Sequence, residues 1–389
     1  MLTTSADRRP SLLAKLGCSS AVLLGLLVTI EVGLRGCGYD PFGRMFADAP
    51  AASREGIDSG LMRIVDGGDE DILVYELNPG ARGYAWQADI QVNSSGFRDR
   101  EFPPEKSPGT LRILALGDSA TFGAKLPVEV LWPAELERLL FKSGLEVEVF
   151  NLGVVGYDVL EEVALLEKHG PALEPDLILV AYHPNDIGHV SATRTYIHRL
   201  QGYGSAWYRI RLLQYLRSKA DLFELNREFH LVNTDEYFLE KNARFIADIG
   251  GDRELSLLME SVRKGVAGRE ELKRLQHRYL EWYTKPDRIG KLRYSFERLQ
   301  RFAGSRGIEV GLFVMPWLGD RGHEAVYDGL YAVVRHEAER NGFEFVPMAP
   351  TTRALGHEKL LIEKRDFGHP NATGHRLMAE RLQETLLAR

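Results

Sequence analysis

Two short segments carry side chains that together could form a nucleophilic site, although they lie far apart in the chain. The first, GDSATFG (117–123), offers the hydroxyl of Ser119, and the second, DFGHPN (366–371), offers His369 with Asp366 three residues before it. A serine hydroxyl becomes a nucleophile when an imidazole takes its proton, and a carboxylate must hold that imidazole in the right tautomer. These residues predict Ser119 as nucleophile, His369 as base and Asp366 as the partner of His369.

Each segment also has a plain structural interpretation. A Gly-Asp-Ser sequence can be a strand-to-helix turn with Ser119 as the N-cap, and Asp366 can cap the helix that follows it. Two further segments, NLG (151–153) and HPND (183–186), offer backbone N–H groups and the Asn185 amide for holding a developing oxyanion. The alternative for both is an ordinary loop in which Asn and Gly supply the turn geometry.

The surrounding pattern predicts elements that would gather these segments. From Leu111 onward, apolar runs alternate with helical stretches, which indicates a parallel sheet with helices on both faces. Three of these segments follow predicted strands and the fourth, DFGHPN, precedes the last predicted helix, so one edge of the sheet, where ligands bind in such folds, would gather them. The predicted strands are 111–117, 147–153, 176–182, 308–316 and 343–348, and the predicted helices are 132–141, 159–169, 324–341 and 372–387.

One stretch interrupts this alternation. Residues at about 190–302 are charged and aromatic and show helical but no strand patterns, which predicts a helical insertion between the third and fourth strands. Its position at the carboxyl edge of the sheet suits a lid or a substrate-selecting role. A helical layer without a direct function is the alternative.

The N-terminus predicts a membrane anchor over residues 1–37. Arg8, Arg9 and Lys15 precede the apolar run LGCSSAVLLGLLVTI (16–30), and flanking charges can extend a span that needs about 20 residues. Basic residues before the span favour a cytoplasmic N-terminus and an exported body. A cleaved signal peptide and a lipid-modified Cys37 are the alternatives. Residues 38–107 are expected to form a linker and a small β element, with turns at Asn78-Pro79-Gly80 and Ser95-Gly96.

The composition argues against nucleic-acid binding, thiol chemistry and metal binding as functions. The net charge is −6, whereas a nucleic-acid binder normally carries a clustered basic excess. The two cysteines, Cys18 and Cys37, both lie near the N-terminus, so the rest of the chain has no thiol nucleophile and no cysteine metal site. We expect neither a metal nor a cofactor, because the remaining histidines do not show ligand spacing: His189, His323, His357 and His375.

Together these segments resemble the SGNH, or GDSL, hydrolase superfamily over residues of about 108–189 and 306–389. The resemblance implies a flavodoxin-like three-layer α/β/α sandwich for a domain at 108–389. It implies that Ser119 is nucleophile and oxyanion donor, that the Gly153 N–H and the Asn185 side chain are the other donors, and that His369 and Asp366 complete the triad. The chain departs from the family at His183, where the family usually has glycine, and Asp118 and His183 are the expected further lining residues.

The N-terminal part is similar to membrane-anchored bacterial members of this superfamily. The similarity rests on the Glu31 to Arg35 segment at the end of the span, the Pro79-Gly80 turn and the segment NSSGFR (93–98). Arg98 could contact a substrate, but a structural salt bridge is the expected role.

Three functions are compatible with this sequence. The first is a serine esterase that hydrolyses acyl esters, with O-acetyl groups on cell-surface glycans as a substrate suggested by the resemblance. The second is an O-acyltransferase that uses the same acyl-enzyme, and the third is a non-catalytic glycan-binding protein on a degenerate hydrolase fold. The expected partners are a small-molecule or glycan ester and the membrane, with no nucleic acid.

Overall fold

The computed structural model divides into two units, Met1–Ala49 with His198–Asn233 and Pro50–Ile197 with Thr234–Arg389. Much of the expected linker, His189 and most of the first half of the expected insertion lie outside the described residues. The structure describes residues 12–37, 60–65, 72–73, 75–103, 105–188, 210, 212–213, 215–216, 244–245, 247–269, 272, 278–364 and 366–389.

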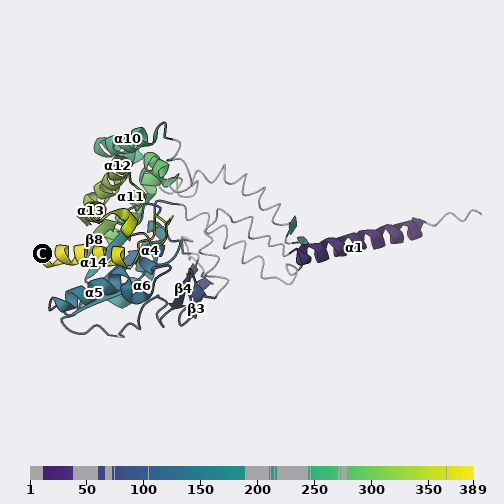
Figure 1. Ribbon diagram of the computed structural model, residues 1–389, viewed down its shortest axis with the longest axis horizontal. Helices are drawn as coiled ribbons and strands as arrows, with labels where there is room; N and C mark the ends of the chain where they lie inside the picture. Colours follow the sequence, from purple (N-terminus) through teal and green to yellow (C-terminus); the bar gives the residue numbers. More distant parts are fainter. Residues whose placement is uncertain are drawn as a thin grey trace, which may run out of the picture. The chain divides into compact units, whose positions relative to one another are not determined.

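In the first unit, the N-terminal apolar run forms the long helix α1 (Leu12–Gly36) (Figure 1). Its stretch Ser19–Gly36 has a mean hydropathy of 1.5, so the helix is long and apolar enough to cross a membrane. The charges near its end compensate each other, because Arg35 Nε lies 2.7 Å from Glu31 Oε1 one turn earlier. By length and composition, this helix can serve as a membrane anchor or as a signal peptide.

The second unit is built on a sheet of five parallel strands: β5 (Leu111–Gly117), β6 (Val147–Asn151), β7 (Leu177–Tyr182), β8 (Glu309–Val314) and β9 (Glu344–Val346). Their order across the sheet is β6-β5-β7-β8-β9. Counted along the chain, this is the order 2-1-3-4-5 of the flavodoxin-like doubly wound fold. The predicted fold class is therefore confirmed, and the strands fall where the apolar runs predicted them.

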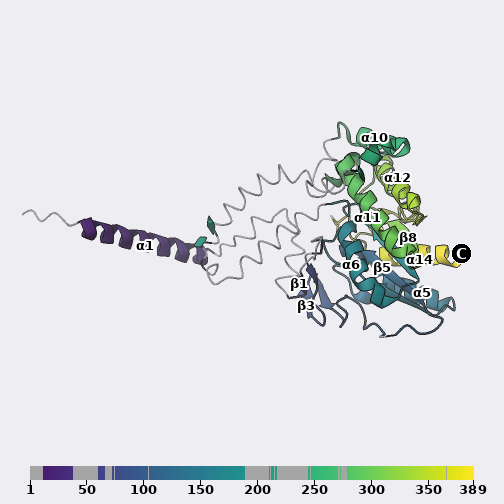
Figure 2. The same cartoon turned by 180° about the vertical axis from the view of Figure 1, so that it is seen from behind.

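Helices cover both faces of the sheet. On one face, α5 (Trp132–Lys142) and α14 (Ala372–Leu387) lie side by side, and Trp132, Leu136 and Met378 pack with alternate strand residues in the core (Figures 1 and 2). On the other face, α6 (Val159–Leu173) packs against α11 (Pro286–Gly304), and Phe296 of α11 contacts Tyr182 of β7. The alternation of strand side chains between two covered faces explains why the strands are apolar almost throughout.

The described part of the expected insertion contains two kinds of structure. Helix α11 packs on α6 and β8, so it is the crossover helix that joins β7 to β8. Upstream of it, α10 (Arg253–Val266) and the 3₁₀ segment η5 (Arg278–Thr284) pack on α12 (Glu324–Arg340), as Figure 1 shows for α10. A buried charge network ties these helices together, since Arg293 binds Glu337 and Asp252.

The small β element consists of two antiparallel pairs. One joins β1 (Met62–Ile64) to β2 (Tyr75–Leu77), and the other is a hairpin of β3 (Arg82–Ala85) and β4 (Ala88–Gln91). The hairpin turns at Trp86 and Gln87, with φ values of 50° and 58°. Two-residue hairpin loops require positive φ, and here non-glycine residues adopt it. The predicted turns at Asn78-Pro79-Gly80 and Ser95-Gly96 are present on either side of it, where the Ala81 N–H donates to the Asn78 carbonyl and the Gly96 N–H to the Asn93 carbonyl. The remaining elements are α4 (Ser119–Phe122), η2 (Val128–Val130), α13 (Ala349–Leu355) and η6 (His357–Lys359).

Candidate active site

Ser119 is the first residue of α4, directly after strand β5. The helix is capped by Asp118, whose Oδ1 accepts a hydrogen bond of 2.9 Å from the Ala120 N–H. The serine hydroxyl is therefore not the cap, contrary to the structural alternative. A Cβ atom at Gly117 would lie 2.2 Å from Thr121 Oγ1, so only glycine allows the chain to turn this sharply from strand to helix.

The structure brings Ser119, His369 and Asp366 into one line of hydrogen bonds. Ser119 Oγ lies 2.9 Å from His369 Nε2, and His369 Nδ1 lies 2.8 Å from Asp366 Oδ1. Because a carboxylate can only accept, Nδ1 carries the proton and Nε2 is left to accept from the serine hydroxyl. Asp366 does not cap α14, since Asn371 fills that position and accepts from the Gly374 N–H at 3.1 Å.

Burial and neighbouring charges shift the pKa values of both Asp366 and His369. Burial alone would raise the pKa of the Asp366 carboxyl, but hydrogen bonds and charges of His369 and Lys125 outweigh it and hold the pKa well below its ordinary value of 3.8. For His369, burial lowers the pKa, but the hydrogen bond to Asp366 and the charges of Asp366 and Asp118 prevail and raise it above 6.5. The carboxylate thus stays ionised and favours the protonated imidazole.

A residue that the sequence did not indicate completes the line. Lys125 Nζ lies 2.7 Å from Asp366 Oδ2 and 3.0 Å from Glu363 Oε2. It follows α4 by three positions, and no spacing rule connects it to a loop about 240 residues downstream. Glu363 was missed as well, although it lies three residues before Asp366 on the same loop.

Asn185 lies on the loop after β7 with an exposed side chain, close to the serine. Its Oδ1 is hydrogen bonded to His183 Nδ1, and His183 Nε2 lies 3.2 Å from the Gly368 carbonyl oxygen. His183 thus joins the loop of Asn185 to the loop of His369. Gly368 permits this contact, because a Cβ atom there would come within 3.3 Å of His183 Nε2 and of the Trp317 ring.

Gly153 has a different environment from the one expected of an oxyanion donor. Its N–H donates to Asn151 Oδ1 at 2.9 Å, and Asn151 Nδ2 donates to the Thr121 carbonyl at 2.9 Å. A Cβ atom at Gly153 would lie 2.3 Å from the Phe122 nitrogen. The glycine therefore allows the segment after β6 to pack closely against α4, and its N–H is already used by a neighbouring side chain.

The predicted site residues other than Gly153 line a cavity of ≈ 350 Å³. Tyr279 of η5 packs edge-on against Trp317 with ring centroids 5.0 Å apart, so the expected insertion contributes a wall of the cavity. Aromatic walls of this kind leave no local sequence signal, because core and pocket aromatics look alike in a sequence. The cavity is lined by Asp118, Ser119, His183, Asn185, Tyr279, Trp317, Glu363, Asp366, Phe367, Gly368 and His369.

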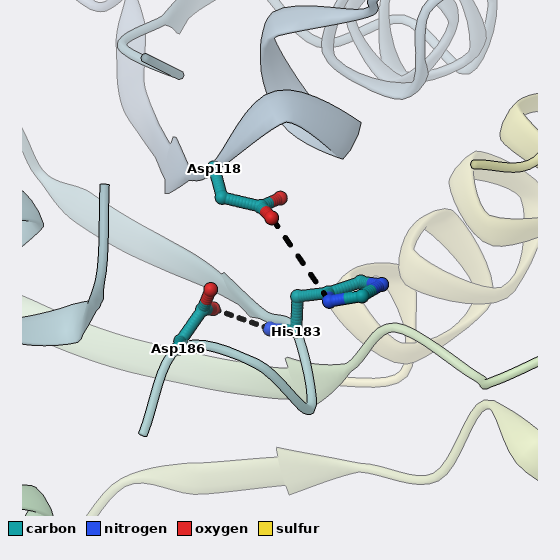
Figure 3. Close-up of side chains that lie close together, drawn as sticks. All are labelled: Asp118, His183 and Asp186. Carbon is teal, nitrogen blue, oxygen red and sulfur yellow. Dashed lines mark hydrogen bonds and ion pairs between the residues drawn. The ribbon is translucent and has the colours of Figure 1, made fainter. Parts of the chain in front are cut away.

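Asp118, His183 and Asp186 are close enough together to be considered as metal ligands, with one potential ligand atom of each lying within 4.8 Å of the others (Figure 3). Each of them already has a protein partner: Asp118 accepts from the Ala120 N–H, Asp186 from the His183 N–H, and His183 contacts Asn185 and Gly368. Burial and the charges of Glu162 and Asp118 raise the pKa of Asp186, which favours its neutral form. The group fits a metal poorly, and the absence of a metal from the reaction stays a prediction.

Arg98 and His375 are structural. The buried guanidinium of Arg98 donates to the carbonyls of Phe122, Gly123 and Leu126, at 2.9, 2.5 and 2.6 Å, so it caps the end of α4 and does not form the expected salt bridge. Burial lowers its pKa to about 10. His375 is also buried and accepts from the Trp132 N–H at 3.1 Å.

Comparison with known proteins gives short or distant similarities. No family model matches the chain. An arylesterase of Vibrio mimicus is 32% identical over 80 residues, which are 21% of this chain and 40% of that protein. The chain thus matches less than half the length of this curated relative.

Several solved structures align with most of the chain. The psychrotrophic esterase EstA from Pseudoalteromonas sp. covers 71% of this chain and 97% of its own, with a TM-score of 0.38 and 12% identity. The lipase/acylhydrolase from Enterococcus faecalis covers 72% and 96%, with a TM-score of 0.40 and 15% identity. A lipolytic protein of the G-D-S-L family from Veillonella parvula covers 72% and 100%, with a TM-score of 0.35 and 15% identity. The fold class of this chain rests on the strand order of its own sheet.

Proposed function

We propose that this protein is a serine hydrolase of the SGNH, or GDSL, type that acts on ester bonds. The observation that carries the proposal is the line from Ser119 through His369 to Asp366, which opens onto a cavity that Asn185 also lines. A hydroxyl, an imidazole and a carboxylate in this order are the parts that acyl transfer to serine requires.

In the first half of the reaction, Ser119 Oγ attacks the carbonyl carbon of the ester while His369 Nε2 takes the hydroxyl proton. The negative charge moves to the carbonyl oxygen, where the Ser119 N–H and the amide nitrogen of Asn185 stabilise it. When the tetrahedral intermediate collapses, the bond to the alcohol oxygen breaks and the alcohol leaves with the proton from His369. Asp366 stays ionised throughout and stabilises the imidazolium.

In the second half, water replaces the alcohol. His369 takes a proton from the water as its oxygen attacks the acyl-serine, and the proton then returns to Ser119 Oγ as the acid leaves. The similarity to an arylesterase supports the ester as the bond that is cleaved. The role predicted for Gly153 is the least supported, because its N–H would have to release Asn151 Oδ1 first.

We further propose that α1 anchors the protein in a membrane, with the hydrolase on the exported side. The length and hydropathy of the helix and the Glu31–Arg35 pair support an anchor, and the basic residues before it support this orientation. An O-acyl group on a cell-surface glycan is then a substrate within reach. Fractionation tests the anchor: the full chain should stay in washed membranes at its uncleaved mass, and a shortened soluble product would contradict it.

The function is tested with the full chain in detergent, an aryl acetate and the variant Ser119→Ala. Loss of the nucleophile should lower kcat/KM by at least about 10³-fold. Ser143→Ala, which removes an exposed hydroxyl at the end of α5, is the matched control and should keep full activity. Equal rates for wild type and Ser119→Ala would disprove the proposal. Acyl product on an added sugar would instead identify a transferase.

A further inference from the structure

Lys125 places a cation against the carboxylate that orients the proposed base. Asp366 uses both of its oxygens: Oδ1 accepts from His369 Nδ1 at 2.8 Å, while Oδ2 lies 2.7 Å from Lys125 Nζ. The side chains of Lys125 and Asp366 are only 18% and 16% exposed, so solvent screens this pair weakly. Glu363, which is 49% exposed, binds the same ammonium group from the cavity side.

The backbone at Lys125 indicates that this side chain has a specific role. The residue has a φ of 69°, in the left-handed region where a side chain is strained and glycine or asparagine is favoured. Its N–H donates to the Trp86 carbonyl at 2.9 Å, so the hairpin turn between β3 and β4 holds it in place. A strained non-glycine residue at an active site is a reason to look for a function of its side chain.

The contacts of Lys125 affect His369 as a base in two opposite ways. By binding Oδ2, the ammonium group fixes the rotation of the carboxylate so that Oδ1 faces His369, which helps catalysis. Its positive charge also offsets part of the negative charge that stabilises the imidazolium, which makes His369 a weaker base. Glu363 in turn offsets part of the charge of Lys125.

We propose that Lys125 is a positioning residue that holds Asp366 and, together with Glu363, sets the pH at which His369 acts as a base. This inference rests on the proposed function, because it concerns the same three residues. It assigns an ion pair to a site in which Ser119 follows β5 while Asp366 and His369 precede α14.

The pKa of His369 also depends on burial and on the other charged groups around it. Burial opposes the charged imidazole, while Asp366 and Asp118 favour it and Lys125 disfavours it. Burial, and after it the charges of His369 and Arg98, lower the pKa of His375 to about 3, so His375 stays neutral across the working range. Replacing Lys125 or Glu363 therefore changes one charge near His369 and leaves the other charged groups in place.

The test compares Lys125→Met with Glu363→Gln in the full chain. In Lys125→Met, the acid limb of kcat/KM should move up by about 0.5 to 1 pH unit, because a positive charge near the imidazolium is lost. In Glu363→Gln it should move down by a smaller amount, because a negative charge is lost. A merely structural lysine would lower the rate or the stability without shifting the two limbs in opposite directions.

Two further variants control for charge and folding. Lys125→Arg keeps the cation, so its acid limb should stay within about 0.3 unit of wild type. Lys106→Met breaks a comparable pair with Asp176, which directly precedes β7 at the opposite edge of the sheet, and should shift nothing. Thermal unfolding of each variant shows that it is folded.

A fluorophosphonate probe distinguishes a failure of the proposed function from a failure of the role proposed for Lys125. Ser119 Oγ forms a bond to phosphorus, fluoride leaves, and His369 takes the hydroxyl proton, so the pH dependence of labelling reports the same base without an assumed ester. If wild type is neither labelled nor active at Ser119, the proposed function fails. If wild type is labelled but Lys125→Met labels with an unchanged pH midpoint, the role of Lys125 is disproved and the proposed function stands.

Discussion

His183 Nε2 lies 3.2 Å from the carbonyl oxygen of Gly368, while its Nδ1 contacts the Asn185 side chain. A single imidazole therefore links the loop that holds the proposed oxyanion donor to the loop that holds the proposed base. Glycine at position 183, which the family resemblance would lead one to expect, could make neither contact. The substitution is thus best understood as an added support for both loops.

This linkage predicts how His183 and Asn185 depend on each other. Asn185→Ala should lower kcat by about 10²- to 10³-fold as an oxyanion donor, whereas His183→Gln should lower it by roughly tenfold with little change in KM. Because His183 supports the position of Asn185, the loss in the double variant should be smaller than the product of the two single losses. Steady-state kinetics of the four proteins test this, with His169→Gln, which breaks a pair with Glu76, as control. Losses that multiply in the double variant would show that His183 acts independently.

The environment of His369 predicts the pH dependence of the reaction. The imidazole must be neutral to accept the serine proton, and its pKa is raised above 6.5 chiefly because the hydrogen bond and charge of Asp366 outweigh burial. Activity should therefore fall as the pH drops, with a midpoint above 6.5. Asp366→Asn should move that midpoint down and lower kcat by about 10⁴-fold. A wild-type midpoint below 6 would contradict this account.

Arg98 is predicted to matter for stability. Arg98→Met leaves the carbonyls of Phe122, Gly123 and Leu126, of which the first two are bound in a buried setting, without their charged donor, which should cost about 3 kcal/mol of unfolding free energy. Such a loss should lower Tm by roughly 5 °C. Arg82→Met, at an exposed position of β3, is the control and should leave Tm within about 2 °C. An unchanged Tm for Arg98→Met would show that water replaces the guanidinium at no cost.

Trp317 is predicted to limit the size of the acyl group. Replacing it with Ala removes a large wall of a cavity of ≈ 350 Å³ and should raise kcat/KM for a hexanoate ester relative to acetate by about tenfold. Trp317→Phe should give an intermediate ratio. The measurement is the ratio of kcat/KM values for p-nitrophenyl acetate and hexanoate. An unchanged ratio in both variants would place the acyl group elsewhere in the cavity.

The sequence predicted the sheet and most of the site for one physical reason. Strands buried on both faces are almost wholly apolar, so β5 and β7 were recognisable, and parallel strands place the residues that follow them at one edge. Ser119 and Asn185 were located in this way, and His369 and Asp366 by their spacing in front of α14. None of these predictions required knowledge of a contact between side chains that are far apart in the sequence.

The features that the sequence did not reveal depend on contacts between residues that are far apart in the sequence. Lys125 reaches Asp366 because the chain has a left-handed residue beside a hairpin turn, and no pattern predicts that turn at Trp86 and Gln87. Gly153 was assigned from its position after a strand, but its N–H is taken by Asn151. Arg98 was expected to meet a carboxylate, and it meets carbonyls because the end of α4 is buried against it.

The separation of Ser119 from His369 by 250 positions has a consequence for the order in which the protein becomes active. The proposed nucleophile is made early, whereas the proposed base precedes α14, whose residues Met378 and Leu382 pack in the same core as Trp132. In the proposed mechanism, Ser119 therefore lacks its base during synthesis until α14 has emerged and docked. If α1 enters a membrane first, as proposed, the domain must then fold around α14 before it can cleave an ester.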